Sequence, residues 1–562
     1  MNHQLNRRSF LKRAGLAAPI IIAGPTIGNS VFAKNTEKEL AADLVIIGGG
    51  LGGCAAALAA ARNDLHVIMT EETDWIGGQL TQQAVPPDEN HWVESFGGTK
   101  SYLSLRQKIR EYYFRNYPLT EKAKKNALLN PGNAWVSRLC HEPRVSLAVL
   151  NDLLAPYVAS GKVRILLRYK AVAAAVHGDR VEAVQVRDLD SGHELVLRAP
   201  YFADATELGD LLPMTKTEFV TGAESQRETG EPGAPEKARP EEMQGFTMSF
   251  ALDYVHGEDH VIEKPADYNF WRNYVPKNAN HTAYRRLSFD EPNSKKIGFD
   301  PYARKGFWTY RRIADRDNFQ PGFYAGDISI INWPQNDYSS GGLIPANDAV
   351  HHINRAKQQS LSLLYWLQTE APRPDGGTGW KGLRLRPDIV GTEDGLAKYP
   401  YVRESRRIQA EFTVLEQHVG TDLRMKETGL KSEEVRAAEF KDSVGIGSYR
   451  IDIHTTTTGG GDRFLSTLPF QIPLGALIPK RMENLLPVCK NIGVTHITNG
   501  CYRLHPVEWN IGESAGLLVT FCLGKKRVPR EVRGEKDLLA DFQNLLDREG
   551  VRREWPKEVG PV

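Results

Sequence analysis

Residues 42–72, ADLVIIGGGLGGCAAALAAARNDLHVIMTEE, restrict the fold of this chain more than any other segment. The segment opens with an apolar run, LVII, that predicts a short strand buried on both faces. Gly48, Gly50 and Gly53 follow in the spacing G-x-G-x-x-G, which permits a tight turn, a close approach of backbone to a pyrophosphate and close helix packing. Gly52 lies within the same turn, and we assign all four glycines to the binding site of a dinucleotide.

A helix, a second strand and an acidic residue complete this pattern. The helix predicted at residues 52–62 is nearly all alanine, so it can pack closely and direct the positive end of its dipole towards a phosphate. The strand predicted at residues 66–70 ends at Glu71, about 20 residues beyond the glycines, where a ribose hydroxyl needs an acceptor. The sequence therefore predicts an α/β fold with a Rossmann-like dinucleotide-binding unit.

The loop after Glu71 indicates which dinucleotide is bound. In NAD enzymes the second strand normally leads into another crossover helix. Here the chain enters a Gly-Gly turn and continues as GGQLTQQAVPPDE. This loop resembles that of the FAD-binding oxidoreductases, and the resemblance implies that Gly78, Gln79 and Leu80 lie beside the ribityl chain and the isoalloxazine ring of FAD.

A meander further along the chain agrees with an FAD fold. Residues 163–203 predict one strand followed by a three-stranded meander with polar turns. The last strand ends in Asp204, Ala205 and Thr206, which resembles the Ala-Thr motif of FAD proteins and implies contacts to the cofactor. The residue after that motif is usually Gly but here is Glu207, which leaves the backbone path near the adenosine open.

The third expected FAD contact is C-terminal, in the stretch RLHPVEWNIGESAG. A strand predicted at residues 484–489 leads to a helix predicted at residues 506–522, in which Pro506 suits the first helical position. Small residues, Gly512 among them, predict close packing on the helix at residues 52–62. The resemblance implies that the free N–H groups at the start of this helix face the pyrimidine edge of the flavin.

His505 is the first candidate for catalysis, because a histidine can accept a substrate proton near working pH. The alternative is a histidine that caps the helix or bonds to a backbone carbonyl. Asn510 and Gly512 are assigned to the cofactor site, although packing and pinning of a loop are the favoured roles for Trp509 and Asn510.

These motifs resemble the FAD-dependent oxidoreductase family over the whole mature chain. The resemblance implies a glutathione-reductase-like FAD-binding domain with a second, mixed α+β substrate domain. The expected boundaries are a signal peptide at 1–33, a first FAD-binding part at 40–212 with the meander at 163–203, a substrate domain at 213–475, a second FAD-binding part at 476–523 and a helical tail at 524–562.

The N-terminus has the pattern of a twin-arginine export signal. Arg7 and Arg8 precede a mildly apolar stretch, and small residues end at Ala33, where cleavage is expected. This leader predicts export to the periplasm through the twin-arginine machinery. Such export carries folded proteins, so it also suggests a tightly bound cofactor.

Composition excludes several classes of protein. The net charge of the chain is +2, and the leader contributes four basic residues, so the mature chain is slightly acidic and does not suit nucleic acid. The five cysteines form no CxxC pair, and no spacing of His, Cys, Asp and Glu predicts a metal site. Beyond the leader, no run is apolar enough to span a membrane.

The middle of the chain supplies further candidates with open alternatives. Arg403 is a candidate for the active site, although arginine runs of this kind usually form structural salt bridges. His454 lies with Asp452 and Arg450 on one face of a strand predicted at residues 448–454, where it lines a pocket or joins a solvated face. Other candidates are Arg138 and His141 for anion binding, and Trp75, Trp92 and Trp135 for stacking on a sugar. The charged segment at 224–242 predicts an exposed or mobile loop that could serve as a lid.

The favoured function is a dehydrogenase or oxidase that transfers hydride from an alcohol or amine carbon to the flavin. A carbohydrate is a plausible small-molecule substrate, and a periplasmic acceptor or oxygen would take the electrons. One alternative is a reductase of an unsaturated acid, in which Arg138, Arg403 and Arg503 would hold the carboxylate. Another is a flavin-binding protein without catalysis.

Overall fold

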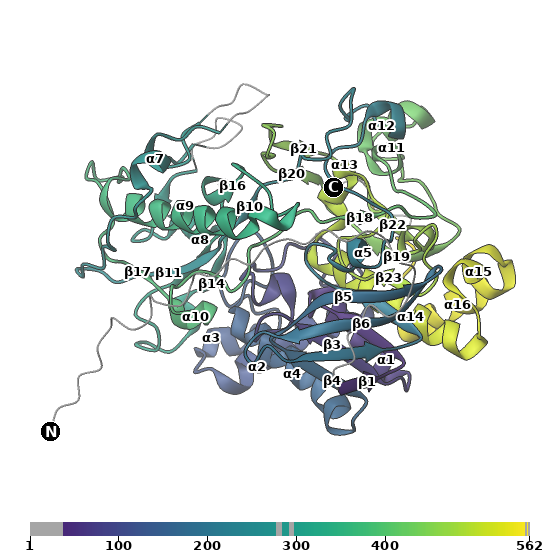
Figure 1. Ribbon diagram of the computed structural model, residues 1–562. Helices are drawn as coiled ribbons and strands as arrows, with labels where there is room; N and C mark the ends of the chain where they lie inside the picture. Colours follow the sequence, from purple (N-terminus) through teal and green to yellow (C-terminus); the bar gives the residue numbers. More distant parts are fainter. Residues whose placement is uncertain (1–37, 277–283, 291–296, 557–558, 560–562) are drawn as a thin grey trace, which may run out of the picture. The chain divides into compact units, whose positions relative to one another are not determined.

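A five-stranded sheet forms the centre of the dinucleotide-binding part. The computed structural model describes residues 38–276, 284–290, 297–556 and 559, so the predicted leader lies outside the described residues. In this sheet all neighbouring strands are parallel and follow the order β23-β8-β2-β3-β4. The strands span Leu485–Pro487 (β23), Tyr201–Asp204 (β8), Leu44–Ile47 (β2), Val67–Glu71 (β3) and Val163–Leu167 (β4). The sheet joins segments from both ends of the chain, and the predicted α/β fold is confirmed (Figure 1).

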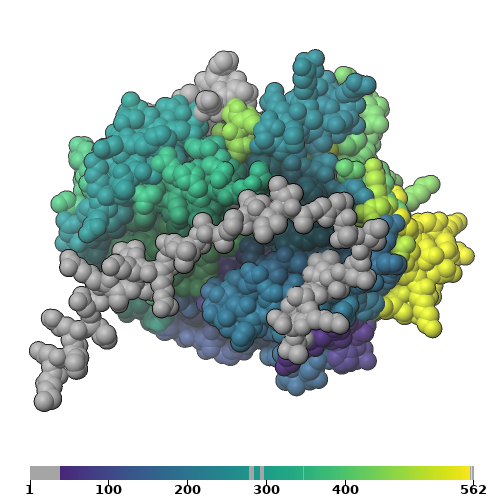
Figure 2. Space-filling view, viewed as in Figure 1, coloured from purple at the N-terminus to yellow at the C-terminus, as the bar shows by residue number. Residues whose placement is uncertain are grey.

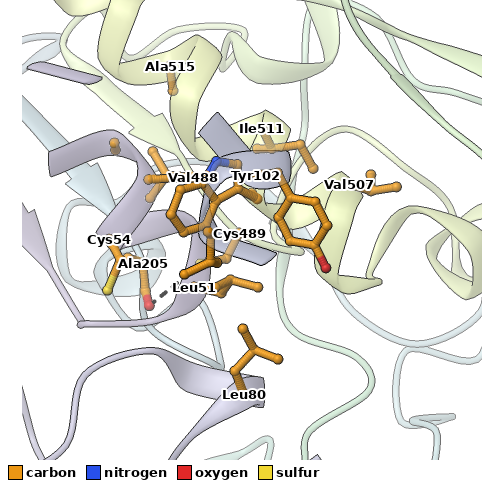
Figure 3. Packing of buried hydrophobic residues seen from close by; sticks show 14 of the residues in the cluster. Leu51, Cys54, Leu80, Tyr102, Ala205, Val488, Cys489, Val507, Ile511 and Ala515 are labelled. Carbon is orange, nitrogen blue, oxygen red and sulfur yellow. Dashed lines mark hydrogen bonds between the residues drawn. The ribbon is translucent and has the colours of Figure 1, made fainter. Parts of the chain in front are cut away.

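Two helices from opposite ends of the chain pack on each other through glycine. Helix α1 spans Leu51–Arg62 and helix α14 spans His505–Lys525, each slightly longer than predicted. A Cβ placed on Gly512 would lie 2.0 Å from the carbonyl oxygen of Gly52, so the two backbones approach as closely as glycine allows. Figure 3 shows side chains of both helices meeting in the main hydrophobic cluster. The predicted small-residue contact is therefore confirmed.

The predicted meander forms a second sheet with an additional strand. Strands β5 (Tyr169–His177), β6 (Arg180–Asp188) and β7 (Glu194–Arg198) run antiparallel, and β1 (Lys38–Ala41) adds to β7 in parallel. Strand β1 was not predicted, because its sequence, KELA, is short and largely exposed and lacks an apolar alternation.

A third sheet is formed by segments from the middle of the chain. It is antiparallel with the order β14-β15-β11-β17, formed by Arg312–Ala314, Ile328–Ile331, Phe250–Tyr254 and Leu383–Leu385. Residues of this sheet and of helix α9 (Ala349–Thr369) share a hydrophobic cluster that is rich in aromatic side chains and holds several buried tryptophans. Figure 1 shows these teal and green elements on one side of the view. Residues 38–562 nevertheless form one compact unit, so the boundaries predicted between the domains stay predictions.

The remaining elements are mostly short. The other helices are Lys100–Asn116 (α2), Glu121–Lys124 (α3), Pro143–Ala159 (α4), Leu211–Met214 (α5), Gln226–Thr229 (α6), Tyr268–Asn273 (α7), Phe307–Tyr310 (α8), Pro387–Val390 (α10), Glu416–Val419 (α11), Thr421–Thr428 (α12), His496–Tyr502 (α13), Pro529–Gly534 (α15) and Lys536–Glu549 (α16). The other strands are Phe219–Val220 (β9), Phe246–Thr247 (β10), Phe299–Asp300 (β12), Lys305–Gly306 (β13), Asp337–Tyr338 (β16), Arg407–Ile408 (β18), Ser443–Gly447 (β19), Ile451–Ile453 (β20), Arg463–Leu465 (β21) and Phe470–Pro473 (β22). No helix in the described part of the chain is both long and apolar enough to cross a membrane.

Two local predictions were wrong. The strand expected at residues 448–454 is only β20, and Arg450 is exposed beside Phe464 instead of sharing the buried face. The segment at 224–242 is not a free lid. It contains the capped helix α6 and is held at its ends by backbone pairing between Ala223 and Arg239. Much of the segment is exposed, and several of its Gly and Pro residues lie in turns.

Candidate active site

A cavity opens at the carboxyl ends of β2, β3 and β8, where open α/β sheets bind nucleotides. The cavity encloses about 430 Å³ of empty space. Five residues predicted from the sequence line it together, namely Gly48, Gly50, Glu71, Ala205 and Thr206. The meander adds Lys170 and Ala171, and residue Tyr399 closes the same cavity.

The glycine turn fits a bound dinucleotide. Gly48 has a φ of +94°, and a Cβ on it would lie 2.4 Å from the carbonyl oxygen of Ala205. A Cβ on Gly50 would lie 2.9 Å from the same oxygen, and one on Gly53 would lie 2.8 Å from the Ala205 side chain. Only glycine therefore allows the turn to approach the end of β8 this closely.

Glu71 lies where a ribose would be held. Its Oε2 accepts a hydrogen bond from Gly49 N at 2.9 Å, and its Oε1 accepts from Thr73 N at 2.8 Å and from Gln82 Nε2 at 3.1 Å. Burial raises the pKa of Glu71 to about 7. The carboxyl group is thus fixed by backbone groups at the end of β3, on the wall of the cavity.

Asp204 has a different role from the predicted cofactor contact. Its two carboxyl oxygens accept hydrogen bonds from Thr206 N at 3.0 Å and from Leu211 N at 3.1 Å. Asp204 is fully buried and does not line the cavity. The residue therefore shapes the loop that presents Ala205 and Thr206.

The unusual Glu207 lies at the amino end of α1. Its carboxylate pairs with Lys490, and its Oε1 has no hydrogen-bond partner in the described structure. Glu508 also reaches this end, because its Oε1 accepts from Gly52 N at 3.4 Å. Two buried carboxylates and one lysine therefore surround the place where α1 offers its N–H groups to an anion.

The Gly-Gly loop connects this region to α14. Gln79 Nε2 donates to the carbonyl of Arg503 at 2.9 Å and to Glu508 Oε2 at 2.5 Å. A Cβ on Gly78 would lie 2.9 Å from Leu51 N, so the loop passes directly over the start of α1. Leu80 is buried in the main hydrophobic cluster and anchors the loop to it.

His505 is completely buried at the start of α14 and lies beside the loop that follows Gln79. Its Nδ1 accepts a hydrogen bond from Asp88 N at 3.0 Å, and its Nε2 has no partner in the described structure. Burial lowers the pKa of His505 to about 3, so the ring is neutral. Because Nδ1 accepts, the proton lies on Nε2, and the ring offers a donor where the predicted base would need an acceptor.

Asn510 and Gly512 do not reach the cavity. The Asn510 side chain accepts from Ile446 N at 3.1 Å and donates to the carbonyl of Val444 at 3.2 Å, which pins α14 to β19. Gly512 lies against Gly52. Both positions serve the packing of α14, and this was the favoured alternative for Asn510.

Arg403 and His454 meet in a chain of buried charges near the start of α14. Arg403 Nη2 lies 2.9 Å from Asp337 Oδ1, and His454 Nδ1 lies 2.6 Å from Asp337 Oδ2. His454 Nε2 lies 3.4 Å from Asp452 Oδ2, and Arg503 Nη2 lies 3.2 Å from the same carboxyl oxygen. We call this series, Arg403–Asp337–His454–Asp452–Arg503, the charge chain.

The charge chain holds its members ionised. Burial alone would raise the pKa of Asp337 and Asp452, but Arg403 and His454 hold the first, and His454 and Arg503 the second, well below the ordinary value. Burial and Arg403 lower the pKa of His454, yet the two carboxylates prevail and raise it above its usual value. The His454 side chain keeps an exposed fraction of 15%.

Buried polar atoms without partners occur in the Gly-Gly loop, in the charge chain and at the start of α14. Among the atoms with no partner in the described structure are those of Gln79 (Oε1), Gln83 (Oε1 and Nε2), Arg403 (Nε), Arg503 (Nε) and His505 (Nε2). Buried polar groups are normally hydrogen-bonded, so a gathering of donors and acceptors without partners points to a polar ligand. The hydroxyl, carbonyl and ring nitrogen groups of a ribityl-isoalloxazine supply both kinds of partner. The residues therefore fit FAD.

Several other candidates lie elsewhere. Arg138 is exposed and makes no ion pair in the described structure. His141 bonds Ser146 Oγ at 2.5 Å at the start of α4, and burial lowers its pKa to about 4. The three tryptophans do not gather. Trp75 lies beneath Arg144 and Lys398, Trp92 contacts Trp555, and Trp135 is 58% exposed and stacks on Tyr310.

The sequence interpretation missed Asp337, Lys490 and Glu508. Glu508 is three residues beyond His505, a spacing that places both at the same end of a helix and could have identified it. Lys490 and Asp337 lie in the stretches PVCKNIG and NWPQNDY, which match no known motif. Their roles depend on which distant segments they meet.

Comparison with known proteins agrees with this geometry. Residues 43–546 match the family described as FAD dependent oxidoreductase. The acrylate reductase flavoprotein subunit of Shewanella woodyi is 35% identical over 77 residues, which are 13% of this chain and 15% of that protein. Among solved structures, quinol fumarate reductase of E. coli has 10% identity and a TM-score of 0.31, covering 91% of this chain and 74% of that chain. A myxobacterial chondrochloren halogenase has 11% identity and a TM-score of 0.31, covering 91% and 80%. Since the family match spans most of the sequence, the chain belongs to the FAD-dependent oxidoreductase family and is an enzyme with FAD as its cofactor.

Proposed function

We propose that this enzyme is a dehydrogenase or oxidase that removes hydride from an alcohol or amine carbon of its substrate. The observation that supports this most is the charge chain, which places His454 between two carboxylates beside the start of α14. FAD, when bound, supplies the two-electron acceptor for the hydride. The proton of the alcohol or amine then needs an acceptor among the protein's own side chains.

His454 is that acceptor in our proposal, in place of His505. Asp337 holds Nδ1 at 2.6 Å and fixes the tautomer and the ring orientation, as a carboxylate does in acid–base dyads. Nε2 is only loosely engaged by Asp452 at 3.4 Å, so this nitrogen can take the proton. Once protonated, the ring is stabilised by both carboxylates. His505 instead contributes an N–H donor at Nε2.

The reductase of an unsaturated acid is less well supported. It requires arginines that are free to hold a carboxylate, yet Arg403 and Arg503 are already paired with Asp337 and Asp452. Arg138, the third arginine of that proposal, is exposed and makes no contact with them in the described structure. The acrylate reductase match covers only 15% of that protein.

An anaerobic reduction assay tests the proposal. The FAD-loaded protein is mixed with neutral polyols and sugars, with amines and, in reduced form, with unsaturated acids, while the flavin absorbance is followed. We expect bleaching by a member of the first two groups. Reoxidation by an unsaturated acid, with no bleaching by any alcohol or amine, would replace the proposal with the reductase. We propose that a periplasmic partner or oxygen then takes the electrons from the reduced flavin.

The carboxylates at the amino end of α1 should lower the affinity for FAD. Replacing Glu207 with Gln should tighten FAD binding by roughly tenfold, because a negative charge leaves the diphosphate site and Lys490 loses its counter-ion. Fluorescence titration of the apoprotein with FAD measures this change. Glu483→Gln, an exposed pair with Arg180, is a matched control. Equal or weaker affinity in Glu207→Gln would contradict the prediction.

We also propose export to the periplasm by the twin-arginine pathway. Replacing Arg7 and Arg8 together with lysine should keep most of the protein in the cytoplasm, because the exporter reads the arginine pair and not its charge. Immunoblots of cell fractions measure the distribution, with Lys12→Arg as a control in the same leader. Undiminished periplasmic protein in the double variant would remove this part of the proposal.

A further inference from the structure

A second cavity lies apart from the FAD cavity and also encloses about 430 Å³ of empty space. Its walls are the segment 223–242, the hairpin of β20 and β21, and the start of α13. In Figure 2 the yellow-green atoms of the hairpin lie at the surface next to the blue-teal segment around residue 230.

The second cavity is separate from the charge chain. Ile453 of β20 lines the cavity, whereas its neighbours Asp452 and His454 belong to the charge chain. Side chains alternate between the two faces of a strand, so the two sites lie on opposite faces of β20. A ligand in this cavity would therefore not occupy the place of a reacting substrate.

Most charges around the second cavity are already paired. Glu242 Oε2 lies 3.0 Å from Arg239 Nη1, and His496 Nδ1 lies 2.9 Å from Glu404 Oε1. Glu224 Oε1 lies 2.8 Å from Arg407 Nη2. These pairs leave two charged residues on the cavity wall without an ionic partner in the described structure.

The first unpaired residue is Glu231, which is 1% exposed. Its Oε1 accepts hydrogen bonds from Glu416 N at 2.8 Å and from Thr495 Oγ1 at 2.7 Å, but no cation reaches it. Burial raises the pKa of Glu231 to about 7. Burying a carboxylate without a counter-ion is costly, so its retention here needs a reason other than stability.

The second unpaired residue is Arg463 on β21. Its Nη1 donates to the carbonyl of Gly233 at 2.5 Å, and the described part of the chain offers it no carboxylate. His496 adds a donor nearby, because its Nε2 has no partner in the described structure while Nδ1 is held by Glu404. The cavity wall thus presents one carboxylate without a counter-ion, that of Glu231, and two hydrogen-bond donors, Arg463 and His496.

We propose that this second cavity binds a small zwitterion, such as a free amino acid, with its ammonium group on Glu231 and its carboxylate on Arg463. A simple amine would leave Arg463 unpaired, and a simple acid would leave Glu231 without a counter-ion. An uncharged polyol would leave both unpaired. The apolar side chains of Ala223, Ile453 and Ile497 offer a surface for the aliphatic part. The site is independent of the reaction proposed above.

Calorimetry with the full-length, FAD-loaded protein tests this inference. The probes are the common free amino acids and, for the best binder, its N-acetyl and carboxamide forms. We expect each masked form to bind at least tenfold more weakly. Glu231→Gln and Arg463→Gln should each weaken binding of the free amino acid by a similar factor, while Glu263→Gln, which is exposed and outside the cavity, should not.

The affinity should also rise between about pH 6 and pH 8, because Glu231 must be ionised to pair with ammonium. The other ionisable groups on the three walls are Glu224, Glu242, Arg239, Arg463 and His496. Because Arg463 is exposed, its variant should fold even if Glu231→Gln does not. Absence of binding, binding that survives masking of either end, or preference for a polyol or a simple amine would each overturn the inference.

Discussion

Replacing His454 with Gln should slow the reduction of the flavin by substrate on the order of a hundredfold to ten-thousandfold, the usual contribution of a general base. The glutamine keeps a polar side chain of similar length but cannot accept a proton. Asp337 and Asp452 would then face each other without the imidazolium that lies between them. Anaerobic stopped-flow measurement of flavin bleaching, under saturating substrate, reports the effect directly.

His505→Gln is the control that separates the two histidines. His505 is neutral and offers an N–H donor, and glutamine can also donate, so we expect a loss of less than about tenfold, below the usual contribution of a base. If His505→Gln causes the larger loss and His454→Gln the smaller, the base is His505 and the proposed role of the charge chain is wrong. FAD content must be equal in both variants for the comparison to count.

The pH dependence of flavin reduction tests whether His454 is the base. The base must be deprotonated before it can act, and the carboxylates raise its pKa. The rate should therefore rise as the pH increases through a value above the ordinary histidine range. Asp337→Asn removes one of those carboxylates and should move this rise to lower pH. An unshifted profile would exclude His454 as the titrating group.

The parallel sheet could be predicted because its signals are local. Strand β2, the glycine turn and helix α1 follow each other within twenty residues, and each glycine has a steric reason that the structure shows. The end of β3 at Glu71 and the end of β8 at Ala205 and Thr206 follow from the same rule, since parallel strands meet a nucleotide at their carboxyl ends. Strand β1 was missed because its sequence has no local pattern that predicts a strand.

The reaction site could be predicted only in pieces. His454 and Arg403 were selected separately, but the carboxylate that joins them, Asp337, is in a stretch without periodicity or motif. No local signal shows that residues 66 and 117 positions away from Asp337 lie within hydrogen-bond distance of it. The tautomer of His505 could not be predicted either, because it is set by Asp88 N, a backbone group 417 positions away.

Replacing Gly512 with Ala should destabilise the protein by about 3 kcal/mol or more, at or above the upper end of usual overpacking costs. The new Cβ would lie 2.0 Å from the carbonyl oxygen of Gly52, and a backbone carbonyl cannot rotate away as a side chain can. Relief requires α14 to move from α1, which also moves Glu508 and His505 from their contacts with Gly52 and Asp88. We therefore expect a lower Tm in thermal scans and weaker retention of FAD in the same variant.

Gly524→Ala in the same helix is the matched control. A Cβ there would meet nothing within 4 Å, and alanine is the better helix former by about 1 kcal/mol, so the Tm should hold or rise slightly. The contrast isolates the contact between the helices from the intrinsic preference of the residue. If Gly512→Ala matched Gly524→Ala in both Tm and FAD content, the close approach of α1 and α14 would not be what joins the two ends of the chain around the cofactor. The orientation of α14 would then have to come from the bonds of Asn510 to β19 instead.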